Sequence, residues 1–158
     1  MTSRIVAAEL STEPSAPTPA SLHRRHFTEL VRVAALMVDD RYLAEEIVQE
    51  AFTRLIAQWE RVDADHAVGY LYRSVSNGAK SALRRRRTVR NHSRAAPEAE
   101  PSAEVAVLRA VGYETLLSAV AALPFRQRQV LALRYYAEKS VAECAAALGL
   151  KESAVTAA

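Results

Sequence analysis

The sequence has few of the residues that shape β-rich, disulfide-bonded or membrane proteins. Its 158 residues include four glycines and one cysteine, and aromatic residues make up 6%. Cys144 cannot form an internal disulfide, and its alanine-rich surroundings predict a small buried side chain. No apolar run approaches the length needed to cross a bilayer, and the N-terminal segment lacks the apolar core of a signal peptide, so we expect a cytoplasmic protein. Abundant alanine without alternating β-branched runs favours an all-α fold.

Patterns typical of catalytic or metal centres are also missing. The four histidines are scattered, and the cysteine is remote from them, so no metal-ligand spacing is present. Glu45 and Glu46 diverge on a helix, which makes an acid/base pair improbable, and there is no glycine-rich phosphate loop. We therefore expect no catalytic residues, no metal, no cofactor and no enzymatic activity.

Acidic residues are absent from Ala67 to Pro97, although the net charge is only +3. If residues 67–87 form one helix, cationic and polar residues recur every three or four positions on one face, and apolar residues line the other. The polar face consists of Arg73, Asn77, Lys80, Arg84 and Arg87. No neighbour in the sequence neutralises this charge, so the face is either solvated or offered to a polyanion.

Two helical segments precede this basic helix. We expect residues 1–20 to be a disordered extension and a first helix to begin at Ser21. Asp40 can cap a second, amphipathic helix over residues 42–59, in an acidic stretch that contrasts with the basic one. Residues 21–87 are thus predicted to form a compact three-helix bundle.

A second unit follows a predicted flexible linker over residues 88–107. In residues 108–158, one helix stops at Leu123 and another begins at Pro124, where a missing N–H is tolerated. Ser140 and Glu143 form a capping box, and Gly149 can end the helix that they start. A further helix near Glu152 would complete a helix-turn-helix, although tight helical hairpins without DNA-binding function share this pattern.

Three segments together resemble the extracytoplasmic-function (ECF) group of the sigma-70 family over residues 21–156: AEEIVQEAFTRLIAQW, GYLYRSVSNGAKSALRRRR and LPFRQRQVLALRYYAEKSVAECAAALGL. The resemblance implies two small helical domains joined by a flexible linker. Residues 21–87 would be sigma region 2, and residues 108–158 would be region 4 with its helix-turn-helix. The implied function is that of a sigma factor, which binds core RNA polymerase and recognises and melts promoter DNA.

The resemblance also assigns site residues. Gln49, Glu50 and Arg54 would dock on the β′ clamp helices, and their outward stripe lacks i,i+4 lysine partners, which is consistent with a docking surface. The loop after Trp59 and the basic helix would hold the melted minus-ten element. The implied DNA-binding residues are Arg73, Asn77, Lys80, Arg84, Arg85, Arg86 and Arg87. Further implied partners are the β flap and, as for many relatives, an anti-sigma factor.

Two features depart from the family pattern. Ser81 stands where many relatives have Asp. Relatives also continue beyond the segment corresponding to KESAVTAA and complete a cationic recognition helix, whereas this sequence ends at Ala158. Lys151, a poor N-cap, stands at the position before the start of this last helix. We therefore expect either a truncated form or weak minus-thirty-five recognition. The terminal Val-Thr-Ala-Ala also resembles ends read by bacterial unfoldase proteases, although two ordinary alanines at an arbitrary end of an alanine-rich protein are the favoured explanation.

Two alternatives to a sigma factor remain open from the sequence. One is a decoy that docks on polymerase through residues 21–87 without selecting promoters. The other is a free-standing helix-turn-helix regulator that binds duplex DNA without polymerase. Extending the last helix would separate a decoy from a sigma factor, and binding to core polymerase would separate both from a regulator.

Overall fold

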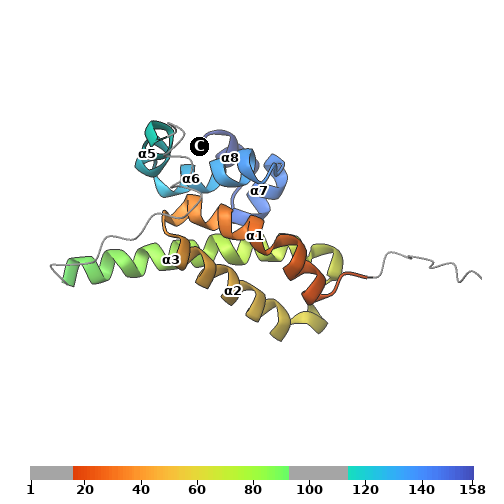
Figure 1. Cartoon of the computed structure of the whole chain (residues 1–158). Coiled ribbons are helices and arrows are strands. Elements are labelled where there is room, and N and C mark those ends of the chain that lie inside the picture. The colour runs from red at the N-terminus through yellow and green to blue at the C-terminus, as the bar shows by residue number, and fades with distance from the viewer. Residues whose placement is uncertain (1–15, 93–113) are drawn as a thin grey trace, which may run out of the picture.

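The computed structural model describes residues 16–92 and 114–158, and within these ranges it is helical without strands. Three long helices form the first unit: α1 (Pro19–Val38), α2 (Arg41–Ala57) and α3 (Ala67–His92). Two short 3-10 turns, η1 (Trp59–Arg61) and η2 (Ala64–His66), connect α2 to α3. Figure 1 shows α3 as the longest helix, with α1 and α2 packed along part of it. The predicted all-α fold is confirmed.

Helix α1 begins two residues before the predicted Ser21. Thr18 caps it by accepting a hydrogen bond from the Ser21 N–H (3.2 Å), and Ser21 Oγ in turn accepts one from the Thr18 N–H (2.9 Å). Pro19 stands in the first turn, where its missing N–H leaves no bond unmade. The predicted disordered extension is therefore wrong for residues 19–20, and residues 1–15 lie outside the described residues.

Helix α2 begins as predicted, with the Asp40 side chain accepting a hydrogen bond from the Leu43 N–H (3.1 Å). The core that it shares with α1 and α3 contains fully buried Leu30, Met37 and Leu55. At Gly78 the backbone of α3 lies so close to Ile47 of α2 that an added Cβ would be 2.8 Å from Ile47 Cγ2.

Helix α3 continues through residues 88–92, which the sequence predicted as the start of a linker. That boundary is wrong because no proline or glycine interrupts the helix before Pro97. Side chains also support its last turn: Thr88 Oγ1 donates to the Arg84 carbonyl (3.1 Å), and His92 Nδ1 donates to the Thr88 carbonyl (2.8 Å). The rest of the predicted linker, residues 93–107, lies outside the described residues.

The second unit is built from short helices. They are α5 (Glu114–Ala122), α6 (Phe125–Leu131), the π-helical turn η3 (Ala132–Tyr136), α7 (Val141–Leu148) and α8 (Glu152–Thr156). Pro124 is the residue before α6 and not its first residue, and the single helix predicted to follow it is split into α6 and η3. The capping box of Ser140 and Glu143 is present, and Gly149 ends α7 with a left-handed φ of 65°.

The second unit packs directly on the first. Helix α7 lies against α3, and α6 and η3 lie against α1. Figure 1 shows this unit seated over α1 and α3, on the other side from α2. Cys144 is fully buried on α7, as its alanine-rich surroundings predict.

Candidate polymerase and DNA interfaces

The outer face of α2 carries the three residues predicted to bind polymerase. Gln49, Glu50 and Arg54 are all exposed. Arg54 forms an ion pair with Glu50 one turn earlier, so the stripe has no lysine partner but contains a cation partner of its own. An exposed i,i+4 pair contributes only a few tenths of a kcal/mol, so its members can exchange partners at little cost.

Two apolar side chains that were not among the predicted site residues extend this face. Tyr42 is 73% exposed and Ile56 is 60% exposed. Together with Gln49 they follow the spacing i, i+7, i+14, which places all three on one side of a helix. This spacing was available in the sequence as a signal. Large exposed apolar groups beside polar ones are typical of protein–protein contact surfaces.

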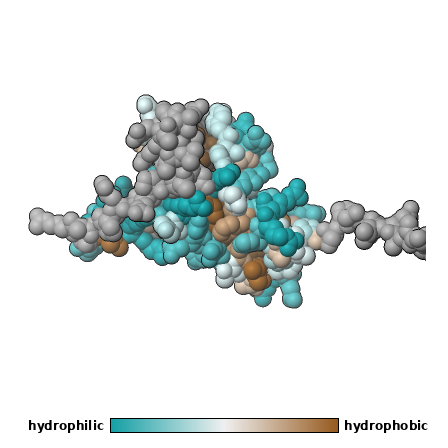
Figure 2. All heavy atoms as spheres, viewed as in Figure 1, coloured by the Kyte–Doolittle hydropathy of each residue, from teal (hydrophilic) through white to brown (hydrophobic). Residues whose placement is uncertain are grey.

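The polar stripe predicted on α3 is present. Arg73, Asn77, Lys80, Arg84 and Arg87 are exposed, whereas Leu71, Val75, Ala79 and Ala82 on the other side are buried. Figure 2 shows mainly hydrophilic residues along this part of the molecule. Arg85 is exposed on the flank of the stripe, and Arg90, which was not predicted, adds an exposed cation in the last turn of α3.

Arg86 differs from its neighbours because it forms an ion pair with Asp40. It follows Ala79 and Ala82 at helical spacing, so it lies on the packing side of α3. Asp40 is 8% exposed and also caps α2, so a single carboxylate connects the start of α2 to the basic end of α3. No acid lies near Arg86 in the sequence, as expected, but Asp40, 46 positions earlier, pairs with it, so this one arginine is not simply solvated or offered to a polyanion.

The connection between α2 and α3 forms a second polar feature. An open cavity of about 360 Å³ lies at the end of α2 and is lined by Ile56, Ala57, Gln58, Trp59, Glu60 and Arg61. In the following turn, Asp63 accepts a hydrogen bond from the Asp65 N–H (3.1 Å) and contacts His66 Nδ1 (3.0 Å). Both interactions hold the pKa of Asp63 below its ordinary value, and the hydrogen bond from the Asp65 backbone N–H contributes more than the contact with His66.

The second unit has the helix-turn-helix geometry, with α7, a left-handed Gly149 and α8. Lys151 precedes α8 without a side-chain capping bond, as expected for a lysine. Val155 packs α8 against the core. The part of the chain that the structure describes contains no group of three or more His, Cys, Asp or Glu side chains arranged to hold a metal ion.

Two family profiles match the chain. Residues 22–89 match the family described as Sigma-70 region 2, and residues 113–158 match Sigma-70, region 4. The chain is also 32% identical over 129 residues to the RNA polymerase sigma-E factor of Streptomyces antibioticus, covering 80% of this chain and 69% of that protein. The chain belongs to the ECF group of the sigma-70 family.

As a sigma factor, the protein is an initiation subunit that binds core RNA polymerase and promoter DNA. Sigma factors perform no covalent chemistry, and neither the decoy nor the free-standing regulator is favoured. The bundle of α1 to α3 contains the whole region 2 match and extends three residues beyond it at each end, and α5 to α8 lie within the region 4 match. Among the described helices, none is both long and apolar enough to span a bilayer.

Proposed function

We propose that this sigma factor docks on core RNA polymerase through the outer face of α2 and holds the melted minus-ten element on the polar stripe of α3. One observation carries the proposal: the two faces belong to one rigid bundle, and each has its functional side chains exposed while its other side is packed. The close approach of Gly78 to Ile47 and the Arg86–Asp40 ion pair keep α2 and α3 in a fixed relation. Docking on polymerase would therefore also set the position of the DNA-binding stripe.

The docking face combines polar specificity with apolar contact. Gln49 offers a neutral donor and acceptor, and the Glu50–Arg54 pair offers one charge of each sign. Tyr42 and Ile56 supply large apolar surfaces at the two ends of the same face. Interfaces commonly gain most of their binding free energy from a few such anchors, with polar groups fixing the register.

The polar stripe of α3 would offset the free-energy cost of melting promoter DNA. Unstacking bases costs a few kcal/mol, which phosphate neutralisation and a pocket for an extruded base offset. Arg73, Lys80, Arg84, Arg85 and Arg87 supply the exposed cations, and Asn77 can donate to and accept from a base edge. The cavity lined by Trp59, Glu60 and Arg61 directly precedes, along the chain, the turn that would receive an extruded base.

We also propose further partners and a cellular location for this sigma factor. Region 4 would contact the β flap, and an anti-sigma factor would be a separate chain that covers one of these faces. Because promoter DNA and polymerase are in the bacterial cytoplasm, the protein would act there. A protease that reads the terminal alanines stays a sequence-based prediction.

Co-elution with bacterial core RNA polymerase at moderate salt tests the docking face. Gln49→Ala/Glu50→Ala/Arg54→Ala should weaken binding at least about tenfold, because interface anchors commonly contribute more than 1 kcal/mol each. The matched control is Arg24→Ala/Glu152→Ala, which removes one cation and one carboxylate from exposed positions on other helices. Equal co-elution of both variants would place the docking surface elsewhere, and failure of the unmodified chain to co-elute would contradict the proposal.

A further inference from the structure

Some hydroxyl side chains follow an arginine by three positions in the sequence. Within the described residues they are Thr28, Ser76 and Thr88, which come after Arg25, Arg73 and Arg85. Arginine at this spacing is the charge pattern by which one large class of Ser/Thr protein kinases selects its substrates. The pattern is most extensive around Thr88, because residues 84–87 are all arginine and Val89 follows directly. The described part of the sequence thus offers three candidate phosphate acceptors, and the structure distinguishes among them.

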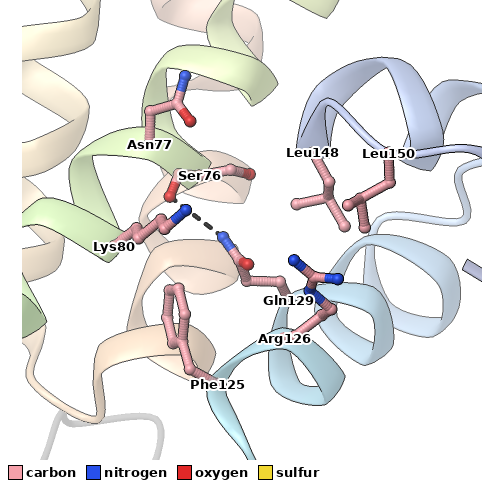
Figure 3. Close-up of a pocket in the computed structure, with 8 residues that line it drawn as sticks. All are labelled: Ser76, Asn77, Lys80, Phe125, Arg126, Gln129, Leu148 and Leu150. Carbon is pink, nitrogen blue, oxygen red and sulfur yellow. Dashed lines mark hydrogen bonds between the residues drawn. The ribbon is translucent and has the colours of Figure 1, made fainter. Parts of the chain in front are cut away.

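The fold excludes Ser76 and disfavours Thr28. Ser76 is 1% exposed on the packed side of α3, and its carbonyl accepts a hydrogen bond from Gln129 Nε2 (3.2 Å), as Figure 3 shows. Thr28 is exposed, but it lies in the middle of α1, two residues before fully buried Leu30. A kinase cleft takes its substrate as an extended segment. Unwinding α1 at Thr28 would expose Leu30 and Val31 to water, which opens the core of the bundle.

The end of α3 that carries Thr88 lies outside this core. Every residue from 84 to 92 is exposed, and Figure 1 shows this end of α3 projecting beyond α1 and α2. Among the described residues, the Arg86–Asp40 ion pair is its one polar contact with the rest of the bundle. Helix ends without tertiary packing open at little free-energy cost. Residues 85–92 can therefore unwind into an extended segment while the three-helix bundle stays folded.

We propose that Thr88 is a phosphorylation site for an arginine-directed Ser/Thr protein kinase, and that the phosphate lowers the affinity of α3 for DNA. In the transfer step, Thr88 Oγ1 forms a bond to the γ-phosphorus of a magnesium-bound nucleoside triphosphate. The bond from that phosphorus to the oxygen shared with the β-phosphate breaks, and a nucleoside diphosphate leaves. The hydroxyl proton passes to a carboxylate of the kinase. The part of the proposal that concerns DNA rests on the proposed role of the polar stripe.

A phosphate on Thr88 would lie at the end of the polar stripe of α3. Thr88 Oγ1 donates to the Arg84 carbonyl one turn earlier (3.1 Å), and Arg87 is the preceding residue. Both arginines are exposed, and neither has an ion-pair partner among the described residues. A phosphothreonine carries a charge of about −1.5 to −2 at pH 7 and forms charge-assisted hydrogen bonds with nearby arginines. It would thus occupy two cations of the stripe and repel the phosphates of an incoming strand.

Incubation of the full chain with magnesium ATP and the catalytic subunit of cyclic-AMP-dependent protein kinase, an arginine-directed enzyme, tests the site. Mass spectrometry of proteolytic fragments should find phosphate on Thr88 and none on Thr28 or Ser76. Arg85→Ala removes the arginine three positions before Thr88 and should slow labelling of Thr88 at least about tenfold, whereas Arg87→Ala should change it little. Absence of phosphate from Thr88, or labelling of Thr28 at the same rate, would overturn the site and leave the DNA role of α3 intact.

Fluorescein-labelled single-stranded DNA measures the consequence of the phosphate. The phosphorylated chain should bind about tenfold more weakly at moderate salt than the untreated chain. Its slope of log affinity against log salt should fall by about 1.4, as expected for two lost phosphate contacts. Thr88→Val has a similar side-chain size without the hydroxyl, so it should bind DNA like the unmodified chain and should keep that affinity after kinase treatment. This control separates Thr88 from any other labelled position.

A pair of variants tests the same effect without a kinase. Thr88→Glu should bind the labelled DNA more weakly than Thr88→Gln, because the two side chains have the same size and differ in charge. Phosphate on Thr88 without weaker DNA binding would overturn the proposed effect and leave the DNA role of α3 intact. Absence of DNA binding by the untreated chain would instead overturn that role, and the effect of the phosphate with it.

Discussion

Region 2 and region 4 differ in how their helices are stabilised. The three helices of region 2 have 17 to 26 residues and enclose a core of large side chains, among them fully buried Leu30, Met37, Leu55 and Leu71. The longest described helix of region 4, α5, has nine residues, and most buried residues of this region are small. Isolated helices shorter than ~12–15 residues are marginal in water. Region 4 therefore depends on the surface of region 2, and region 2 depends little on region 4.

The largest expected effect comes from removing a core side chain of region 2. Leu30→Ala should lower the free energy of unfolding by about 3 kcal/mol, since a buried leucine loses both its transfer free energy and its packing contacts. Both regions should then unfold together, because α6 and η3 pack on α1. Urea titration followed by circular dichroism and by fluorescence of Trp59, the single tryptophan, measures this.

Leu133→Ala is the matched change in region 4, where Leu133 is also fully buried. The helical circular dichroism signal should begin to fall at a lower urea concentration than in the unmodified chain. The Trp59 fluorescence transition should keep its midpoint, because Trp59 lies in region 2. An equal shift of the Trp59 transition in both variants would show that the two regions form one cooperative unit and that the contrast between them is wrong.

Gly78→Ala tests how closely α2 and α3 approach inside region 2. The new Cβ would lie 2.8 Å from Ile47 Cγ2, and overpacking of this kind costs about 1–3 kcal/mol, against about 1 kcal/mol gained in helix propensity. We expect a net loss of about 1 kcal/mol in urea unfolding. In an Ile47→Ala background the same change should become stabilising, because the obstructing methyl group is gone. A loss of the same size in both backgrounds would rule out this contact as the cause.

Arg86→Ala and Arg87→Ala should separate structural from DNA-binding arginines on α3. Arg87→Ala should reduce the slope of log affinity against log salt for single-stranded DNA by about 0.7, as expected for one lost phosphate contact. Arg86→Ala should leave that slope nearly unchanged and lower stability by about 1 kcal/mol, because it leaves Asp40 without its partner. Asp40→Asn, which keeps a good N-cap, should reproduce the stability loss. A reduced slope for Arg86→Ala would show that it contacts phosphate.

Local periodicity and capping rules predict most helices of both regions, because each of these signals spans a few residues. Asp40 and Ser140 were identifiable as caps, and Gly149 as a terminator, from their neighbours alone. The Arg86–Asp40 pair joins residues 46 positions apart, and the Gln129–Ser76 bond joins residues 53 apart. No local pattern encodes such partners. The spacing from Ala82 indicates on which side of α3 Arg86 lies, but not what it meets there.

The smallest expected effect concerns the cap of α7, on which an eight-residue helix depends strongly. Glu143 accepts a hydrogen bond from the Ser140 N–H (2.8 Å), which holds the pKa of this carboxyl below its ordinary value of 4.5. A carboxyl whose pKa is lowered by folding stabilises the folded state above its unfolded pKa, and this contribution is lost as the pH falls through the folded value. Glu143→Gln should thus lower the stability of region 4 by about 0.5 kcal/mol at neutral pH. The difference should shrink toward zero below pH 4.5, and it should appear in circular dichroism without moving the Trp59 transition. A stability difference between Glu143→Gln and the unmodified chain that stays constant with pH would mean that the glutamine side chain disrupts the cap sterically. The carboxylate charge of Glu143 would then not contribute.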